Sequence, residues 1–489
     1  MLEKLAKQTA VYGVSTILVR FLSYLLTPYY TRVFGQEAYG IVTDVYALIP
    51  LALTLLTMGM ESSYFRFTAK AEADGGEVAA AKKRLFATTW GSTTLAALLF
   101  TAAVVIFRAP IAEVMGEAYV AQPAYLVWVA LIILMDVASA IPFARLREEG
   151  RSMTFVGLKL VGVVVNVVLA FGFGFAGLFE SAFGVGWVFV ANFVASLLSW
   201  LLLLKAVGTV GWQIDRKVLR RVLVYSLPLL IGGLAGTANE FLDRQLIKYL
   251  VPEGAMAELG IYGAITKIAV VMMLFYQMYR LAAEPFFLSN FRKEEFKEMN
   301  AAALKYYLMA SMVIFLAIAL FRDLFALIVG RDFREGIYIL PVVLGANMLA
   351  GVWLNLSFWY KREERTSLAI VVTGCGLVVT MVAGIALIPH MGYYGAAWMR
   401  LASEAAMVAV SLWLNRRYYP TPYDWRRITE YVVVGLLAFF AAEQVREAWS
   451  EMPAGYYAAN VMMFIAYGAY LVRRERIDLR ALVRSVLKR

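Results

Sequence analysis

The sequence predicts an all-α polytopic membrane protein with about fourteen transmembrane helices, and three observations support this fold class. Hydrophobic residues make up 62% of the 489 residues and charged residues only 17%, whereas soluble domains contain about 45–50% apolar and about 25% charged residues. The apolar residues form tracts close to the roughly 20 residues that a membrane-spanning helix needs. The connections between these tracts are too short for a separate soluble domain.

Fourteen tracts have this character, and each is expected to form one span. The first lacks a small-residue cleavage pattern, which favours a retained span over a signal peptide. The approximate limits are 10–33, 39–65, 86–107, 120–145, 153–177, 183–205, 220–249, 259–284, 301–321, 336–360, 367–389, 393–415, 428–445 and 455–472. An even number of spans places both ends of the chain on the same side of the membrane.

Lys and Arg residues are divided unequally between the two sides of this arrangement. The side with both termini carries 33 of them and the opposite side carries 7, while 6 lie inside spans. Because cytoplasmic segments of membrane proteins are enriched in Lys and Arg, both termini are expected in the cytoplasm. Most of the net charge of +11 therefore reflects topology, and no nucleic-acid partner is needed to explain it.

Three pairs of similar segments indicate an internal repeat that relates span n to span n+6. The pairs are VYGVSTILVRF at 11–21 with VYSLPLLIGGL at 224–234, AYGIVTD at 38–44 with IYGAITK at 261–267, and FARLREEGRS at 143–152 with FWYKREERTS at 358–367. Six is even, so both copies have the same orientation in the membrane. The predicted organisation is an N-terminal lobe at 1–208, a C-terminal lobe at 209–422, two extra spans within 423–472, and a basic amphipathic cytoplasmic tail at 473–489 that contacts membrane lipids.

Several ionisable residues fall inside the predicted spans, where charges are costly and usually serve function. The segment NEFLDR at 239–244 carries three of them in span 7. Glu240 precedes Arg244 by four residues, which is the favourable order for an ion pair on a helix. Asp243 is then left without an assigned partner within this segment.

Other intramembrane charges divide into two groups. Arg400 and Glu404 are four residues apart on span 12 and can form an ion pair on one helix face. Asp136 and Lys159 lie at similar depth on neighbouring spans. In both pairs we expect the base to neutralise the acid. The remainder fall on spans 1, 2 and 8: Arg20, Asp44, Glu61, Lys267, Arg280 and Glu284. With span 7, these spans concentrate charge as the wall of a polar cavity requires.

The chain resembles the polysaccharide flippases, the O-antigen (Wzx-type) translocases, of the multidrug/oligosaccharidyl-lipid/polysaccharide exporter superfamily. The resemblance is carried by LTPYYTRVFGQEAYG after span 1 and by an LP…DR…YG pattern in spans 7 and 8, and it extends over nearly the whole chain. It implies two parallel six-helix lobes around a central cavity that is lined largely by spans 1, 2, 7 and 8. It also implies a bacterial plasma-membrane protein that moves undecaprenyl-pyrophosphate-linked oligosaccharide from the inner to the outer leaflet.

The resemblance assigns roles to the charges on the cavity spans. A pyrophosphate needs cationic donors, so the expected substrate-binding residues are Arg20, Lys267, Arg280 and Arg244. The expected ion-coupling residues, which would bind a proton or Na⁺, are Asp44, Glu240 and Asp243. Two alternative functions share the fold: a lipid II flippase of peptidoglycan synthesis, and a multidrug/cation antiporter, which should favour acidic, aromatic cavities.

The sequence contains no recognisable catalytic or cofactor-binding motif. GFGFAG at 172–177 has the glycine spacing of a dinucleotide fingerprint, but it ends a membrane helix and follows no strand. A single histidine, His390, does not make a metal site, and a single cysteine, Cys375, excludes an internal disulfide. We therefore expect a protein that is not an enzyme and that binds neither cofactor nor metal.

The charge asymmetry predicts that a periplasm-active reporter, such as alkaline phosphatase, is inactive when fused after Arg489. The same reporter fused after Glu335, in the predicted outer loop between spans 9 and 10, should be active and serves as the control. Measuring both enzyme activities in intact cells tests the orientation. High activity of the Arg489 fusion would refute it.

Overall fold

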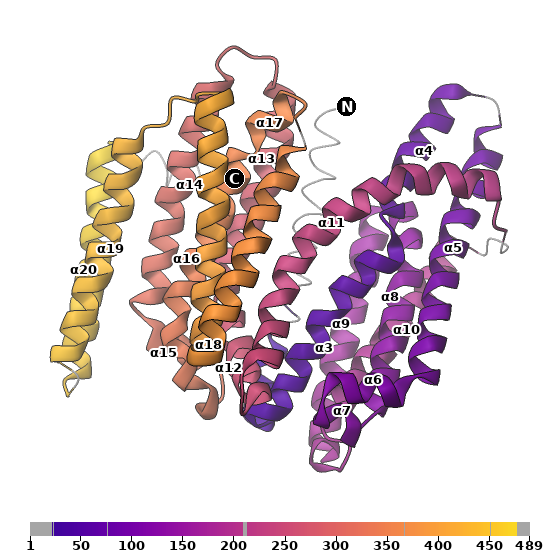
Figure 1. Ribbon diagram of the computed structural model, residues 1–489, viewed down its shortest axis with the longest axis horizontal. Coiled ribbons are helices and arrows are strands. Elements are labelled where there is room, and N and C mark those ends of the chain that lie inside the picture. Colours follow the sequence, from indigo (N-terminus) through magenta and orange to yellow (C-terminus); the bar gives the residue numbers. More distant parts are fainter. Residues whose placement is uncertain are drawn as a thin grey trace. The chain divides into compact units, whose positions relative to one another are not determined.

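Every regular element in the described part of the chain is a helix, which confirms the predicted all-α class. The structure is a computed structural model that describes residues 22, 24–75, 77–208, 213–365, 367–449 and 451–476, with only the backbone at 231–233 and 235–240. Within these residues there is no β-strand. The chain divides into two compact units, Met1–Gly263 and Ala264–Arg489 (Figure 1).

The first unit is a bundle in which α8 packs against α5, α10, α3 and α4, while α3 and α4 also pack against α11. Its helices are α2 (Leu26–Val33), α3 (Gln36–Thr57), α4 (Met60–Asp74), α5 (Val78–Ile106), α6 (Arg108–Met115), α7 (Glu117–Ala121), α8 (Ala124–Glu148), α9 (Ser152–Phe175), the 3₁₀ turn η1 (Leu178–Glu180), α10 (Gly186–Val207), α11 (Arg216–Leu250) and the first part of α12 (Ala255–Ile268). The predicted second span, 39–65, is therefore two helices. They meet at Met58 and Gly59, which both have left-handed backbone conformations.

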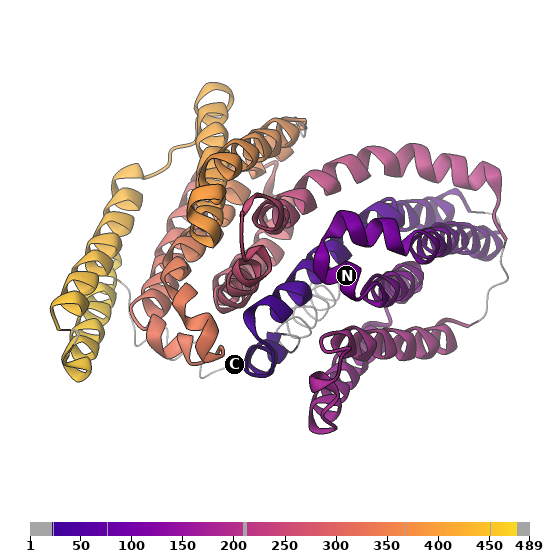
Figure 2. The same ribbon diagram turned by 60° about the horizontal axis from the view of Figure 1, so that its bottom comes forward.

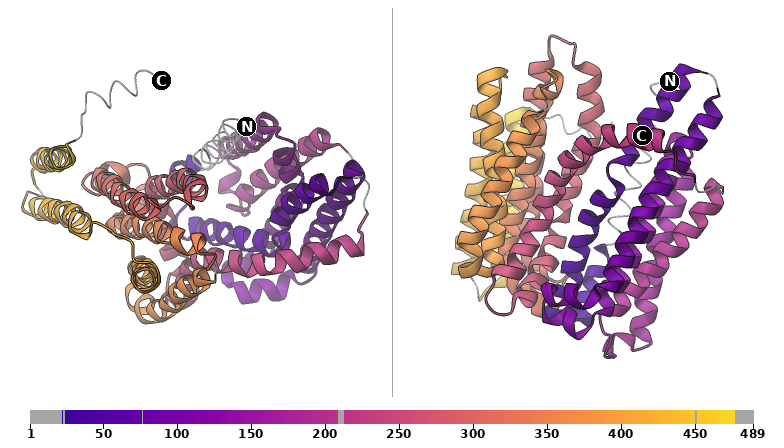
Figure 3. Two further views of the ribbon diagram at one scale, coloured as in Figure 1. Left: turned by 90° about the horizontal axis from the view of Figure 1, so that it is seen from above. Right: turned by 45° about the vertical axis from the view of Figure 1, so that its right-hand side comes forward.

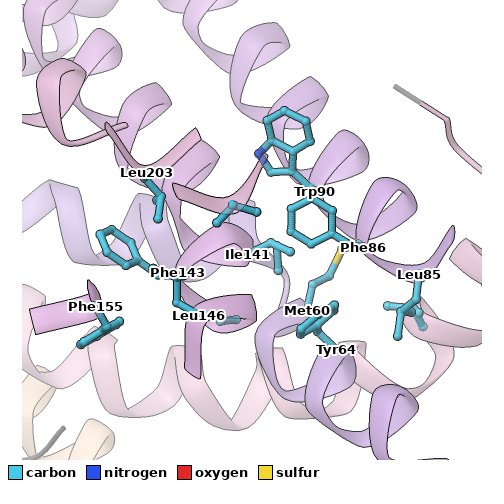
Figure 4. Packing of buried hydrophobic residues seen from close by; sticks show 13 residues of the cluster. Met60, Tyr64, Leu85, Phe86, Trp90, Ile141, Phe143, Leu146, Phe155 and Leu203 are labelled. Atoms are coloured by element: carbon cyan, nitrogen blue, oxygen red, sulfur yellow. The ribbon is translucent and has the colours of Figure 1, made fainter. Parts of the chain in front are cut away.

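A cluster of buried aromatic and aliphatic side chains joins α4, α5, α8, α9 and α10 (Figure 4). Phe86 and Trp90 of α5 stack with a centroid distance of 5.9 Å, and Phe143 of α8 contacts Phe155 of α9 edge to face. The indole N–H of Trp90 donates to the carbonyl of Ala138 at 2.9 Å, so its polar atom is satisfied. Lipid is as apolar as these side chains, so close van der Waals packing, rather than exclusion of water, holds the helices together.

Helix α11 is the longest single helix of the first unit and is visibly curved (Figure 1). It begins after Asp215, whose side chain accepts hydrogen bonds from the backbone N–H groups of Val218 and Lys217. These hydrogen bonds hold the pKa of Asp215 below its ordinary value, and the carboxylate caps the positive end of the helix dipole. The cap fixes where the seventh predicted span begins.

The second unit contains α13 (Val270–Asn290), α14 (Phe296–Ala319), α15 (Arg322–Ala326), the 3₁₀ segment η2 (Arg331–Ile339), α16 (Leu340–Leu356), α17 (Phe358–Arg362), α18 (Leu368–Tyr418), α19 (Trp425–Ala448) and α20 (Pro453–Glu475). Its largest buried cluster is aromatic. Trp359 of α17 stacks on Tyr419 with a centroid distance of 5.9 Å, and Phe287 of α13 contacts Phe358. This cluster joins α13, α14, α16, α17 and α18.

Helix α18 has 51 residues, which at 1.5 Å per residue would extend over about 75 Å if it were straight. Gly392 interrupts it with φ 55° and ψ −132°, a conformation that glycine adopts without steric cost. On either side of this break, Thr380 donates to Ser403 and Ser403 donates to the carbonyl of Gly376, each at 2.9 Å. The two halves therefore lie antiparallel, which confirms the predicted separate spans 367–389 and 393–415.

Nine helical segments of the described chain are long and apolar enough to cross a membrane, or ten if α12 and α13, which meet at 52°, form one broken span. The sequence predicts fourteen spans, and four predicted spans account for the difference between fourteen and ten. Span 1 lies mostly outside the described residues, and the two halves of α18 count once. In span 7 the side chains at 231–233 and 235–240 lie outside the described residues, and the tyrosines and asparagine of α20 lower the hydropathy of span 14.

Helices α19 and α20 lie side by side within the second unit (Figures 2 and 3). Charged clusters attach them to α14 and α15 at both ends. At one end, Glu475 accepts from Lys305 at 2.9 Å and from Arg427 at 3.1 Å. At the other end, Arg322 pairs with Glu443 at 2.6 Å, and the carboxylate of Asp323 binds Arg446 and Tyr456. Because ion pairs hold both ends, the last two spans are firmly fastened to α14 and α15.

The repeated segments form similar contacts in the two units. Arg147, in the first REE segment, pairs with Glu61 at the start of α4 at 2.5 Å. Lys361, beside the second REE segment, pairs with Glu284 of α13 at 3.2 Å. Glu61 and Glu284 are 223 residues apart, the same offset as between AYGIVTD and IYGAITK, so each copy joins an acid of its second span to a basic residue after its fourth.

The glycines of the YG motifs allow α3 and the first half of α12 to approach closely. A Cβ atom at Gly40 would overlap the carbonyl of Met256, and one at Gly260 would overlap the carbonyl of Gln36. A Cβ atom at Gly263 would meet the side chain of Thr43. Small residues at a helix crossing let two backbones touch, which is a principal source of helix association in membranes.

We expect Gly260→Ala to destabilise the protein by about 1–3 kcal/mol, as overpacking at a tight contact does. Gly468→Ala is the matched control, because a Cβ atom at Gly468 of α20 meets nothing within 4 Å. Thermal unfolding of the purified protein in detergent measures both. Equal melting temperatures for wild type and Gly260→Ala would show that this crossing is not tight.

Candidate functional site

A fully buried carboxylate, Asp44 of α3, lies at the centre of a polar cluster that joins α3, α7 and α11. Its Oδ1 atom accepts from the amide of Gln245 at 2.6 Å. Its Oδ2 atom accepts from the ammonium of Lys248 at 2.5 Å and from the hydroxyl of Tyr119 at 2.6 Å. We refer to Asp44, Lys248, Gln245 and Tyr119 as the Asp44 cluster.

The geometry of the Asp44 cluster satisfies both charges. Exposure of the side chain is 4% for Lys248 and 0% for Asp44, so the pair is removed from solvent. Buried ions repay the loss of hydration only when the geometry is good and further hydrogen bonds satisfy the remaining atoms. The ammonium of Lys248 also lies 4.8 Å from the ring centroid of Tyr119 and 5.3 Å from that of Tyr249, where the aromatic faces stabilise a cation.

Sequence reasoning identified Asp44 but missed its partners. It counted Lys248 among the basic residues near the outer surface, and it did not single out Gln245 or Tyr119. A signal was present in span 7, because Lys248 follows Arg244 by one helical turn and so lies on the charged face of NEFLDR. The position of Tyr119, in a short helix between two spans, leaves no comparable periodic signal.

The second polar cluster surrounds Asp243, whose residue is 1% exposed. The hydroxyl of Tyr262, on α12, donates to its Oδ2 atom at 2.8 Å. The guanidinium of Arg244 lies 3.4 Å from its Oδ1 atom. Asp243 is thus paired with its own neighbour Arg244. The predicted pair between Arg244 and Glu240 stays a prediction. The side chain of Glu240 lies outside the described residues.

Two of the predicted substrate-binding residues belong to the second unit. Lys267 lies half-buried in the last turn of α12, immediately before the 52° bend into α13. Arg280 is 55% exposed and pairs with Glu284, one turn away, at 3.4 Å. Glu284 also pairs with Lys361 at 3.2 Å, so two cations share one carboxylate and the group carries a net positive charge.

Three further charged residues that the sequence placed inside spans are Arg20, Arg400 and Glu404. Arg20 lies outside the described residues. Arg400 donates to Asn347 at 3.2 Å, and Glu404 accepts from the indole of Trp353 at 3.0 Å, so each has a polar partner on α16. In the part of the chain that the structure describes, no group of three or more His, Cys, Asp or Glu side chains is arranged to hold a metal ion.

The comparisons with known proteins follow this geometry. A family model described as "Polysaccharide biosynthesis protein" matches residues 5–291, which is more than half of the chain. The chain belongs to the polysaccharide biosynthesis protein family. It is 21% identical, over 406 residues, to "Lsg locus putative protein 1" of Haemophilus influenzae, covering 80% of this chain and 95% of the relative. The family match confirms the resemblance found in the sequence.

Solved structures show which fold this member of the polysaccharide biosynthesis protein family has. It is similar to the "Lipid II flippase MurJ, inward closed conformation" with a TM-score of 0.75 and 12% identity, covering 96% of this chain and all of that one. It is also similar to an inward-facing multidrug resistance MATE family transporter of the MOP superfamily, with a TM-score of 0.66 and 15% identity over 84% of this chain and 98% of the other. The fold is therefore that of multi-pass membrane transport proteins, in agreement with the expectation that the chain is not an enzyme.

The family match includes both polar clusters of the first unit. Residues 5–291 contain α3, α7, α11, α12 and all of α13. The Asp44 cluster, the Asp243 pair, Lys267 and Arg280 all fall inside this range, whereas α14 to α20 lie beyond it. The part of the chain that identifies the polysaccharide biosynthesis protein family is thus also the part that carries the candidate site residues.

Replacing one member of the Asp44–Lys248 pair should destabilise this family member strongly. Asp44→Asn and Lys248→Met are each expected to cost about 3–5 kcal/mol, because each leaves an uncompensated buried charge. The double variant should cost much less than the sum of the two. Melting temperatures of the four proteins in detergent form a double-mutant cycle that measures the coupling.

The control is the more exposed pair Arg280–Glu284. A double-mutant cycle with Arg280→Met and Glu284→Gln should give a coupling free energy of only about 0–1 kcal/mol. Additive effects at Asp44 and Lys248 would contradict a buried ion pair.

Proposed function

We propose that this protein is a flippase that moves undecaprenyl-pyrophosphate-linked oligosaccharide from the inner to the outer leaflet of the bacterial plasma membrane, for the synthesis of a surface polysaccharide. The observation that carries the proposal is that the polysaccharide biosynthesis family match includes spans 1, 2, 7 and 8, which carry most of the charges inside the predicted spans. A lipid-linked sugar has a polar, anionic head group that cannot cross hydrocarbon unaided, and intramembrane charges offer it a path.

The head group would be bound by Arg20, Arg244, Lys267 and Arg280. Pyrophosphate oxygens accept charge-assisted hydrogen bonds, and guanidinium groups offer planar pairs of donors. The group of Arg280, Lys361 and Glu284 supports this assignment, because two cations on one carboxylate leave one positive charge for an anion to neutralise. We add Lys361 to the proposed contacts for that reason.

Asp44, Glu240 and Asp243 are proposed to take up a proton or Na⁺ during the return of the empty carrier. The contacts of Asp44 set a condition on this role. Lys248 and Tyr119 occupy one carboxylate oxygen and Gln245 the other, so a cation would bind Asp44 only after Lys248 withdraws. Such exchange would couple ion binding to separation of α3 from α11.

The membrane potential is proposed to help drive the outward step. A lipid-linked pyrophosphate carries about two negative charges, and the cell interior is negative. The field supplies about 2.3 kcal/mol per charge per 100 mV, which gives roughly 4.6 kcal/mol for two charges that cross the full field at 100 mV. Basic residues that moved with the head group would reduce this gain.

A lipid II flippase of peptidoglycan synthesis is the second candidate function. The similarity to the lipid II flippase MurJ, with a TM-score of 0.75, favours keeping it, although the identity of 12% supports a common fold rather than a common substrate. Both candidates move an anionic polyprenyl-linked sugar, so they predict the same basic contacts. A multidrug antiporter fits less well, because basic residues repel cationic drugs.

The test is reconstitution into liposomes with defined lipid-linked substrates. We expect an undecaprenyl-pyrophosphate-linked oligosaccharide to be flipped faster than lipid II. Arg20→Ala should lose most of this activity and Arg20→Lys should retain part of it. Arg292→Ala, in the loop after α13, is the matched control that should flip at the wild-type rate.

Each result has a defined meaning. A wild-type rate for Arg20→Ala would remove Arg20 from the proposed site, and faster transport of lipid II would favour the second candidate. The same liposomes under an imposed potential, with no proton or sodium gradient, test the energetic proposal. Rates that ignore the size and sign of the potential would exclude its direct contribution.

A further inference from the structure

Another intramembrane acid, Asp136, lies at the midpoint of α8. Twelve residues separate it from each end of Ala124–Glu148, which corresponds to about 18 Å of helix on either side. It is therefore near the centre of a hydrocarbon core that is about 30 Å thick. The hydroxyl of Ser196, on α10, donates to its Oδ1 atom at 3.0 Å.

Asp136 differs from other acids of the predicted spans because no ion pair neutralises it. Asp44, Asp243 and Glu284 each have a basic nitrogen within 4.0 Å. Among the residues that the structure describes, none places a basic nitrogen that close to the carboxylate of Asp136. The partner that the sequence suggested, Lys159 of α9, instead holds its ammonium 4.1 Å from the ring centroid of Phe143.

Neutral oxygen and amide groups surround this carboxylate. Asn192 and Ser196 are four residues apart on α10 and share one face. The amide of Asn192 donates to the hydroxyl of Tyr46, on α3, at 3.1 Å, and Tyr46 interacts electrostatically with Asp136. Lys159 is the charged group that acts on Asp136 from α9.

The more distant charges lie near the ends of α4 and α8. Lys159 also interacts electrostatically with Glu61 and Arg147, which pair with each other at 2.5 Å. Glu61 and Arg147 neutralise each other, so neither compensates the charge of Asp136 or of Lys159. The helices that face Asp136 thus provide a serine hydroxyl that is bonded to it, a tyrosine and a lysine that interact with it electrostatically, and an asparagine that is bonded to that tyrosine.

We propose that Asp136, Ser196, Asn192 and Tyr46 form a binding site for a monovalent cation, either a proton or Na⁺. An unpaired carboxylate at the centre of a bilayer is costly to keep ionised, and a bound cation removes that cost. A proton would bind the carboxylate itself. Na⁺ is a hard cation that prefers oxygen ligands, which the carboxylate, the serine and tyrosine hydroxyls and the asparagine amide supply.

Lys159 gives this site a release mechanism. Its flexible four-carbon stem can carry the ammonium from Phe143 toward Asp136. When the bound cation leaves, Lys159 takes its place as the neutralising charge. When a cation binds, Lys159 returns to the aromatic ring. The role of this site in transport rests on the proposed function, whereas the binding of a cation does not.

Infrared difference spectroscopy of the purified protein tests the site without any transport substrate. We expect the wild type to show the C=O band of a protonated carboxylic acid that disappears as the pH rises, and Asp136→Asn to lack this band. Added Na⁺, but not choline, should remove the band at constant pH if Na⁺ shares the site. Loss of the band with pH alone would identify a proton-specific site.

Three further variants keep the test decisive if Asp136→Asn folds poorly. In Lys159→Met the band should persist to higher pH, because a competing positive charge is gone. Ser196→Ala removes one ligand and should weaken cation binding at least several-fold. Ser139→Ala is the matched control on α8, since its hydroxyl bonds only within its own helix, to Met135 at 2.7 Å.

A wild-type spectrum with no band that depends on Asp136, together with a melting temperature that responds to neither pH nor Na⁺ through Asp136, would overturn the proposal. In that case the carboxylate is permanently ionised and Lys159 balances it. Loss of flipping in liposomes with the band intact would instead count against the proposed function and leave the cation site standing.

Discussion

Neutralisation of charge inside an apolar bundle is the constraint on which the rest of this structure depends. The low dielectric of the membrane makes an isolated ion very costly, so each intramembrane charge needs a partner, and the partner determines which helices must meet. The Asp44 cluster shows this most clearly. One carboxylate organises contacts from α7 and α11, and the tight crossing of α3 with α12 at Gly40 and Gly260 lies on the same helix.

The sequence predicted the fold class and most spans because hydropathy is a local property. Spans 11 and 12 show how well this works, since Gly392 breaks α18 where the sequence separates 367–389 from 393–415. The break of span 2 at Met58 and Gly59 was not predicted, because an apolar helix can continue through such residues. Only the folded structure shows that both adopt left-handed backbone conformations.

The candidate site was predicted less completely, for a physical reason. Ion pairs within one helix follow the rule of residues three and four apart, and the pair of Arg280 with Glu284 obeys it. Partners on different helices leave no such periodic signal. Lys248 is 204 residues from Asp44 in the chain, and Arg244 bonds to the adjacent Asp243, a pairing that the rule of three and four does not include.

The separation of Asp44 from Lys248 has a consequence for how the protein is made. A ribosome adds about 5–20 residues per second, so the 204 residues between the two take roughly 10 to 40 s to synthesise at that rate. Throughout that interval α3 has entered the membrane with a carboxylate whose basic partner does not yet exist. During biogenesis Asp44 must therefore be protonated, remain in contact with water, or be shielded by the insertion machinery until α11 arrives.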